Sequence, residues 1–241
     1  MKKLNLLCLS LTSLFLVSGN IQAAEIYFGQ DLGWINNDDA TNSDTAHEAF
    51  VSNLTGVGTE SFESYARGDT APLSVDFGIA GIATLSGGGE IETTYVGQGN
   101  GRIAYSGTQF WETSSNSFTI SFSAPIAALG FYGVDFGDFD GQISATLGGH
   151  NTATYEIPHL TGGDVADNLN GSLLYWGIIE TETFDSITFS NTGSSADYFG
   201  FDDFTIGSLE QVTPVPVPAA VWLFGSALFG LVGFSRKRSK A

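Results

Sequence analysis

Two short acidic segments of the chain have residue types and spacings that suit calcium. Asp138 and Asp140 stand two residues apart and precede Gly141, as in the first half of a calcium-binding loop, although the later ligands of that loop are missing. Asp202 and Asp203 are adjacent, so they can offer a carboxylate and a backbone carbonyl to one ion. The alternative for both segments is a set of solvated carboxylates in a turn or at a strand end.

Several large aromatic residues have the chemistry of a sugar-binding surface. Sugar rings stack on aromatic faces, while neighbouring carboxylates accept hydrogen bonds from sugar hydroxyls. The residues predicted for stacking are Trp111, Tyr132 and Trp176, with Tyr175 as a further candidate. The alternative is that these aromatics, which occupy strand positions, belong to the hydrophobic core.

Signatures of an enzyme are few. His47, His150 and His159 are dispersed, His47 lacks the second histidine of a zinc-protease helix, and no nucleophile elbow occurs. We therefore predict no catalytic residue. A glycosidase needs only two opposed carboxylates, however, and the chain has 26 acidic residues. A secreted polysaccharide hydrolase stays open as the alternative to a non-catalytic protein.

The acidic residues are concentrated in the middle of the chain. All 26 lie between Glu25 and Glu210, where Arg67 and Arg102 are the only basic residues, so this part has a formal charge of −24 although the whole chain has −18. Nucleic-acid binding depends on Lys and Arg at phosphates, and this composition excludes it. Cations and neutral sugars remain as ligands.

The N-terminus has the pattern of a secretory signal peptide over residues 1–23. Lys2 and Lys3 precede an apolar run, and small residues at Ala23 and Ala24 provide a cleavage site. The apolar run is too short to span a bilayer. Its Cys8 is the only cysteine of the chain, so the mature protein has neither a disulfide nor a thiol for catalysis.

The C-terminus combines three segments that indicate a membrane anchor. A proline-rich linker over residues 210–218 contains the sorting motif Val215, Pro216, Val217 and Pro218, and the alternating prolines keep it extended. Residues 219–235 are predicted to form a transmembrane helix. The basic tail 236–241 stays in the cytoplasm by the positive-inside rule, so the acidic domain faces outward.

This order of proline motif, apolar helix and arginine-rich end resembles the PEP-CTERM sorting signal of Gram-negative bacteria that secrete exopolysaccharide. Val217 stands where the naming motif of that family has glutamate. The resemblance implies export across the inner membrane, a membrane-anchored intermediate and an exosortase as processing partner. It further implies a final place at the cell surface or in the extracellular matrix, with exopolysaccharide as a partner.

Residues 24–209 are predicted to form one all-β domain, a jelly-roll or β-sandwich. Residues 117–123 and 186–190 alternate apolar and hydroxyl side chains, as half-buried strands do. Glycine-rich turns separate the strand candidates, which favours a two-sheet architecture. A short helix is expected over residues 43–54. The other strand candidates are residues 73–77, 81–85, 127–134, 142–147, 173–179 and 198–206.

The domain itself resembles the globular part of a recurring group of PEP-CTERM proteins over residues 62–207. Its segment 197–207 also looks like the closing strand of jelly-roll carbohydrate-binding modules. In those modules, an aspartate of the closing strand and a glutamate of the opening strand hold a structural calcium ion. The resemblance therefore implies a calcium site that pairs Glu63 with Asp202 or Asp203, and a non-catalytic carbohydrate-binding or structural function.

Overall fold

The computed structural model describes residues 24–34, 39–94, 102–113, 117–136, 141–160, 171–193 and 198–213. The predicted signal peptide, the sorting motif of residues 215–218, the apolar segment 219–235 and the basic tail lie outside these ranges. Within them, no helix has both the length and the apolar character that crossing a membrane requires.

The described residues are built mainly from β-strands, which confirms the prediction of an all-β domain. The expected helix over residues 43–54 is α1, which covers Thr41–Val51. The two 3₁₀ helices are η1 (Gly78–Ala80) and η2 (Leu209–Gln211). The strands are β1 (Glu25–Asp31), β2 (Gly58–Glu60), β3 (Leu73–Asp76), β4 (Ile82–Gly87), β5 (Glu90–Thr93), β6 (Gln109–Thr113), β7 (Ser117–Val134), β8 (Ile143–Gly148), β9 (Thr154–Glu156), β10 (Leu173–Asn191) and β11 (Phe199–Gly207).

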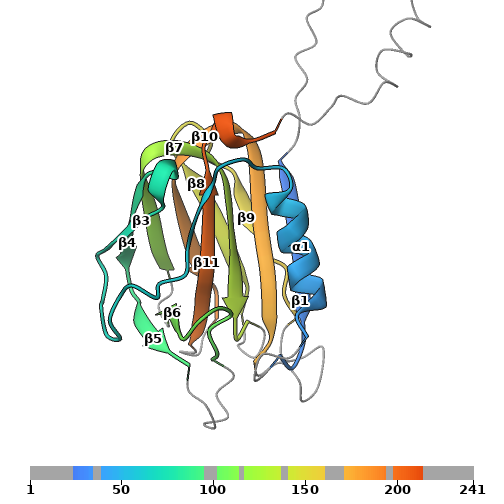
Figure 1. Cartoon of the computed structure of the whole chain (residues 1–241), viewed down its shortest axis with the longest axis vertical. Helices are drawn as coiled ribbons and strands as arrows, with labels where there is room; N and C mark the ends of the chain where they lie inside the picture. Colours follow the sequence, from blue (N-terminus) through green and yellow to red (C-terminus); the bar gives the residue numbers. More distant parts are fainter. Residues whose placement is uncertain are drawn as a thin grey trace, which may run out of the picture.

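Strands β7 and β10 are long enough to take part in both layers of a sandwich (Figure 1). In one layer, β4 and β8 flank residues 117–122 of β7 and 186–191 of β10. In the other layer, β11 and β1 flank residues 126–134 of β7 and 173–179 of β10. All pairs are antiparallel, and the register between β7 and β10 shifts between Ile179 and Ser186, where both strands pass from one layer to the other.

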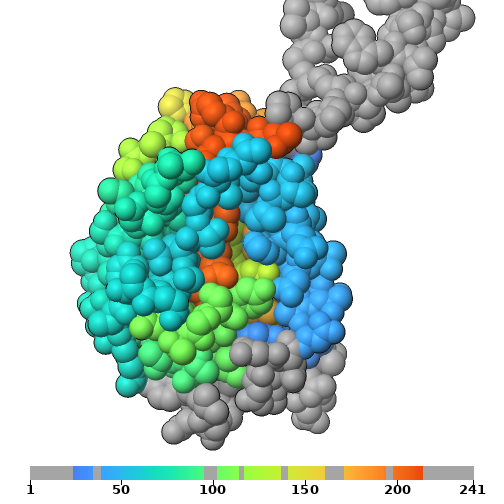
Figure 2. All heavy atoms as spheres, in the orientation of Figure 1, coloured from blue at the N-terminus to red at the C-terminus, as the bar shows by residue number. Residues whose placement is uncertain are grey.

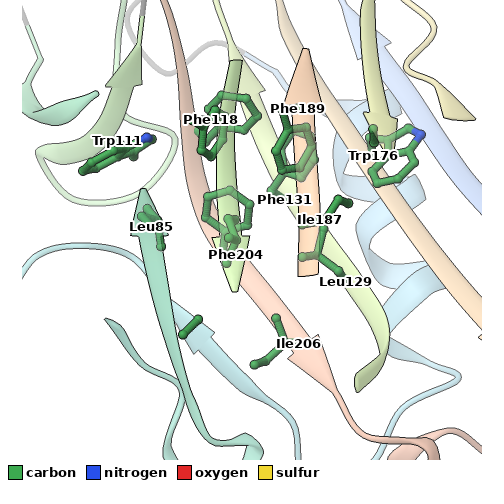
Figure 3. Packing of buried hydrophobic residues seen from close by; sticks show 14 of the residues in the cluster. Leu85, Trp111, Phe118, Leu129, Phe131, Trp176, Ile187, Phe189, Phe204 and Ile206 are labelled. Atoms are coloured by element: carbon green, nitrogen blue, oxygen red, sulfur yellow. The ribbon is translucent and has the colours of Figure 1, made fainter. Parts of the chain in front are cut away.

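An aromatic core fills the space between the two layers. The ring of Phe131 lies 5.4 Å from that of Phe189 in the opposite layer and 4.9 Å from that of Phe201. Phe118 lies 4.9 Å from both Phe189 and Phe201, and Figure 3 shows Phe118, Phe131 and Phe189 packed together. Full burial of each such side chain contributes about 1.5–3 kcal/mol.

Helix α1 covers the outer face of the second layer and creates a second core. Side chains alternate along a strand, so Phe131 and Trp176 enter the core between the layers, while their neighbours Tyr132 and Tyr175 point toward α1. Both faces of this layer are therefore buried. Gly29 of β1 lets the helix approach closely, because a side-chain carbon there would overlap the carbonyl oxygen of Asn42.

The beginning of α1 is fixed by Asp31, at the end of β1. The carboxylate of Asp31 accepts hydrogen bonds from the backbone N–H groups of Asn42 (3.1 Å) and Ser43 (2.8 Å). The first N–H groups of a helix have no partner within the helix, so this contact satisfies two of them. It fixes the position of the first turn of α1, which carries Asp44.

Candidate functional site

One face of the molecule is hollowed beside α1. Figure 2 shows this hollow bounded by α1 (blue), by the chain that follows it (cyan) and by residues 102–113 (green), with β11 (orange) and β7 (yellow-green) at its floor. Hydrogen bonds and ring contacts join the same segments, and they identify the side chains of the site. We call this concave surface the hollow.

Asp44 of α1 holds two tyrosine hydroxyls. Its Oδ1 accepts hydrogen bonds from Tyr105 (2.8 Å) and Tyr132 (3.0 Å). The two tyrosine rings are stacked, with centroids 3.5 Å apart and planes 7° from parallel. Burial, with the carboxylate of Asp44 nearby, raises the pKa of Tyr105 to about 12. Tyr105 is half-buried and covers the fully buried Tyr132.

His47 lies one helical turn after Asp44 and packs against two tyrosines of the sheet. Its ring centroid is 5.3 Å from that of Tyr132 and 5.1 Å from that of Tyr175. Burial lowers the pKa of His47 below its ordinary value of 6.5, although the nearby carboxylates, among them Asp203, act in the opposite direction. Burial thus favours the neutral form of the imidazole.

Asp202 lies at an irregularity of β11. The register between β11 and β7 shifts between Asp202 and Thr205. The Asp202 side chain is fully buried, and its two oxygens accept hydrogen bonds from the backbone N–H groups of Ser106 (2.9 Å) and Asp203 (2.8 Å). Burial, with the carboxylate of Asp203 beside it, raises the pKa of Asp202 well above its ordinary value. Asp202 thus anchors the segment around Ser106 to β11.

Asp203 is the accessible carboxylate of this pair. It is half-buried, and its φ of 45° lies in the left-handed region, which Asp and Asn occupy more readily than most residues. Its Oδ1 accepts a hydrogen bond from the hydroxyl of Ser106 (2.7 Å). Burial raises the pKa of Asp203; the carboxylate of Glu63 raises it further, while Ser106 and His47 oppose the rise.

Tyr175 has a buried hydroxyl with no hydrogen-bond partner within the described residues. The hydroxyl lies against Gly130 of β7, where a side-chain carbon would overlap it. Burial, and secondly the negative charge of Asp203, raise the pKa of Tyr175 well above its ordinary value. Buried hydroxyls are normally paired, so this one is desolvated without the gain of a hydrogen bond.

For two residues of the predicted calcium site, Glu63 and Asp203, the structure shows an effect at a distance: the Glu63 carboxylate raises the pKa of Asp203. Glu63 is exposed, and its Oε1 accepts hydrogen bonds from the backbone N–H groups of Thr108 (2.8 Å) and Gln109 (2.6 Å). Across the ranges given above, no group of three or more His, Cys, Asp or Glu side chains is arranged to hold a metal ion. Asp138 and Asp140 lie outside those ranges. The calcium site stays a prediction.

The three aromatic residues predicted to stack on sugar are buried instead. Trp111 and Trp176 belong to the core between the layers and Tyr132 to the core beneath α1, and each is 0% exposed. A sugar needs an accessible ring face, which none of these rings offers. The core alternative accounts for their positions, and Tyr105 is the ring that lies between Tyr132 and solvent.

Four residues of the site were not predicted: Asp44, His47, Tyr105 and Ser106. The predicted helix contained the signal for the first two, since a spacing of three residues places them on one face. Tyr105 and Ser106 lie in a segment without regular structure before β6, and no local pattern marks their contacts with residues about 60 and 100 positions away.

The comparisons with known proteins give only distant resemblances. No family model matches the sequence, and no curated protein matches it. The K2 cleaved adhesin domain of Lys-gingipain is 16% identical, with 63% of this chain and 97% of that domain covered at a TM-score of 0.40. The K1 domain from Porphyromonas gingivalis W83 is 11% identical, with 64% and 99% covered and a TM-score of 0.38. The CBM22-1 xylan-binding domain from Paenibacillus barcinonensis Xyn10C is 16% identical, with 63% and 100% covered and a TM-score of 0.31. These overlaps are too loose for residues to be matched one to one, so no residue role is transferred.

Proposed function

We propose that the chain is an exported, non-catalytic protein of the cell surface or extracellular matrix, and that it binds carbohydrate in the hollow. The observation that supports this most directly is a pair of hydrogen bonds, Tyr105 to Asp44 and Ser106 to Asp203, between segments that bound the hollow or form its floor (Figure 2). Carboxylate and hydroxyl oxygens pair with sugar hydroxyls, and the half-buried ring of Tyr105 adds an aromatic surface.

Binding explains this arrangement better than hydrolysis does. A glycosidase needs two carboxylates free to act on opposite sides of one bond. Asp202 is fully buried, with both oxygens bonded to backbone N–H groups, and Asp44 is bonded to two tyrosines. Glu63 is exposed, but its two oxygens accept hydrogen bonds from Thr108 and Gln109. Asp203, with one oxygen bonded to the Ser106 hydroxyl, is then the carboxylate best placed to contact a ligand.

The proposed destination follows from the two ends of the sequence. The signal peptide would export the acidic domain, and the PEP-CTERM-like tail would anchor it in the inner membrane until an exosortase processes it. Exopolysaccharide is then the polymer that the domain meets. Calcium, as a structural ion at Glu63 and Asp203, is kept as part of this proposal.

The test is binding of the full-length chain, in mild detergent, to exopolysaccharide from a Gram-negative bacterium that has an exosortase. We expect cosedimentation with the polymer and no release of reducing ends. Asp203→Asn should weaken cosedimentation, whereas Asp185→Asn, which changes an exposed carboxylate of the other layer, should not. If the chain releases reducing ends, and one carboxylate-to-amide change abolishes this activity, the protein is a hydrolase and the proposal of a non-catalytic function is wrong. If the chain neither cosediments with the polymer nor releases reducing ends, the proposed carbohydrate function is wrong.

Sorting is tested separately by removing residues 215–241. We expect the truncated chain to lose its membrane-anchored intermediate and to change its location in cell fractionation. A matched variant with Pro216→Ala and Pro218→Ala keeps the apolar segment and tests the motif itself. Normal delivery of the truncated chain to the surface would show that the sorting hypothesis is wrong.

A further inference from the structure

Several exposed apolar side chains lie at one end of the sandwich, where β7 and β10 pass from one layer to the other. We call this end the bend end. Ile79 of η1 is 84% exposed, Ile82 of β4 48% and Leu209 of η2 44%. Ala124 and Pro125, in the bend of β7, are exposed as well. Apolar side chains that form one exposed patch mark a surface that contacts a protein or a membrane.

Contacts between the turns show that these side chains belong to one surface. The N–H of Ile82 donates to the hydroxyl of Ser123 at 3.0 Å, which places the start of β4 beside the bend of β7. Gly56 lies between η1 and η2, because a side-chain carbon there would be 3.4 Å from Cδ1 of Ile79 and 4.0 Å from Nε2 of Gln211. Figure 1 shows η2 (orange-red) at the same end as the bends of β7 and β10. The exposed apolar side chains are therefore grouped at the bend end.

The chain leaves the described domain at this same end. The N–H of Thr213 donates to the carbonyl of Asn53 at 2.8 Å, just after α1 ends and three residues before Gly56. Only residues 214–218 separate Thr213 from the apolar segment 219–235, which the sequence predicts to cross the membrane. Even a fully extended chain of this length spans only about 20 Å. The predicted anchor therefore keeps the bend end close to the bilayer.

We propose that the bend end contacts the headgroup layer of the bilayer in the anchored protein, with Ile79 and Leu209 as the inserted side chains. This inference rests on the membrane anchor of the proposed function and adds the surface of the domain that meets the lipid. Headgroups fill about 5–8 Å of the distance that the connection can span. A short tether also gives the second contact a high effective concentration, so a small apolar surface suffices.

The charges at the bend end favour an apolar contact with neutral headgroups. Asp76, Glu182 and Glu210 are exposed there. In the part of the chain that the structure describes, the only Lys or Arg residues are Arg67 and Arg102, which form ion pairs with glutamates of β5 and β6 at the opposite end (Figure 1). The bend end thus lacks the basic cluster that binds anionic lipid. We expect the contact to form on phosphatidylcholine and to persist at high salt, because salt screens charges and not apolar burial.

The experiment places a fluorophore at the bend end of the full-length chain in lipid nanodiscs. Cys8→Ser removes the only cysteine, and Ala124→Cys then gives one site for an environment-sensitive label. The nanodiscs contain phosphatidylcholine, a fraction of which carries a nitroxide on the headgroup. We expect blue-shifted emission and quenching by the nitroxide at position 124. The same label introduced by Thr192→Cys, at an exposed position just after β10 and at the opposite end, should show neither.

Substitutions of exposed residues test whether the apolar side chains make the contact. Ile79→Ser combined with Leu209→Ser should abolish the quenching at position 124. Leu32→Ser should not, although it changes a leucine of similar exposure, 38% against 44%, just after β1 at the opposite end. Thermal midpoints in detergent should be the same for all of these variants, because the changed side chains are exposed.

The outcomes separate this inference from the proposed anchor. Incorporation into nanodiscs without quenching at position 124 would overturn the inference and leave the anchor intact. A chain that does not enter nanodiscs would overturn both. A blue shift without quenching would mean that a protein segment, from this chain or from a second copy, covers the bend end in place of lipid. Loss of quenching at high salt would overturn the apolar nature of the contact.

Discussion

Tyr132 and Tyr175 lie side by side beneath α1, with ring centroids 5.0 Å apart, yet only one of their hydroxyls has a partner. Tyr132 donates to Asp44 at 3.0 Å. The hydroxyl of Tyr175 is buried without a partner in the described part of the chain. The hydroxyl of Tyr132 therefore stabilises the folded state, whereas the hydroxyl of Tyr175 destabilises it.

Replacing each tyrosine by phenylalanine should change stability in opposite directions. A buried hydroxyl without a partner is desolvated at no gain, so we expect Tyr175→Phe to raise the free energy of unfolding by about 1 kcal/mol. Tyr132→Phe removes a hydrogen bond to a carboxylate and should lower it by about 1–2 kcal/mol. Urea denaturation of both variants measures the difference. A loss of stability in Tyr175→Phe would mean that the hydroxyl is paired in solution.

Asp203→Asn should stabilise the domain while it weakens ligand binding. Burial and Glu63 disfavour the charged carboxylate, and an amide of the same shape removes that cost. Asn also tolerates the φ of 45° at this position, so the backbone is not strained. We expect a gain of about 1 kcal/mol in urea denaturation. Asp185→Asn is the control. If Asp203→Asn were less stable than the original chain, the Asp203 carboxylate would stabilise the folded state, contrary to this prediction.

The stability of the domain should fall as the pH rises from acidic to neutral values. Burial raises the pKa of Glu112 to about 7, although its ion pair with Arg102 acts against this, and it also raises those of Glu60, Asp202 and Asp203. The folded state therefore retains protons that the unfolded state releases. This contribution is complete below the ordinary pKa of 4.5 and is lost as the pH rises through about 7.

Thermal unfolding between these two pH values measures this dependence. For Glu112 alone, the free energy of unfolding should fall by up to about 3 kcal/mol over that interval. Glu112→Gln should flatten the curve near pH 7 and leave the part that depends on Asp202 and Asp203. A midpoint that rises with pH over the same interval would contradict the assigned directions of the pKa changes.

Much of the fold could be predicted from the sequence because its signals are local. Alternation of apolar and hydroxyl residues predicted the strand segments now seen in β7 and β10, and the helix differs only in its bounds. The sequence did not show that residues 117–123 and 127–134 form one strand. Pro125 suggests a break, but the chain passes it in an exposed stretch where β7 leaves one layer for the other.

The site was harder to predict because its contacts are long-range. Asp202 and Asp203 were identified as adjacent acids, but their different environments depend on the irregularity in β11 and on Ser106, which lies 96 positions from Asp202. Tryptophan is a residue type that suits a sugar-binding surface, but Trp111 and Trp176 are both buried in the core. Only the packing of the two layers distinguishes these roles, and no local pattern contains that information.

Calcium would act on the carboxylates by removing their repulsion. The negative charges of Glu63 and Asp203 repel each other. Calcium prefers carboxylate oxygens as ligands. We expect millimolar calcium to raise the thermal midpoint by about 2–4 °C for each kcal/mol of binding, and EDTA to reverse the change. Magnesium is the control, since it demands a stricter octahedral geometry and should act less. The double change Glu63→Gln and Asp203→Asn should abolish the response. A midpoint that neither calcium nor EDTA alters would show that the calcium prediction is wrong.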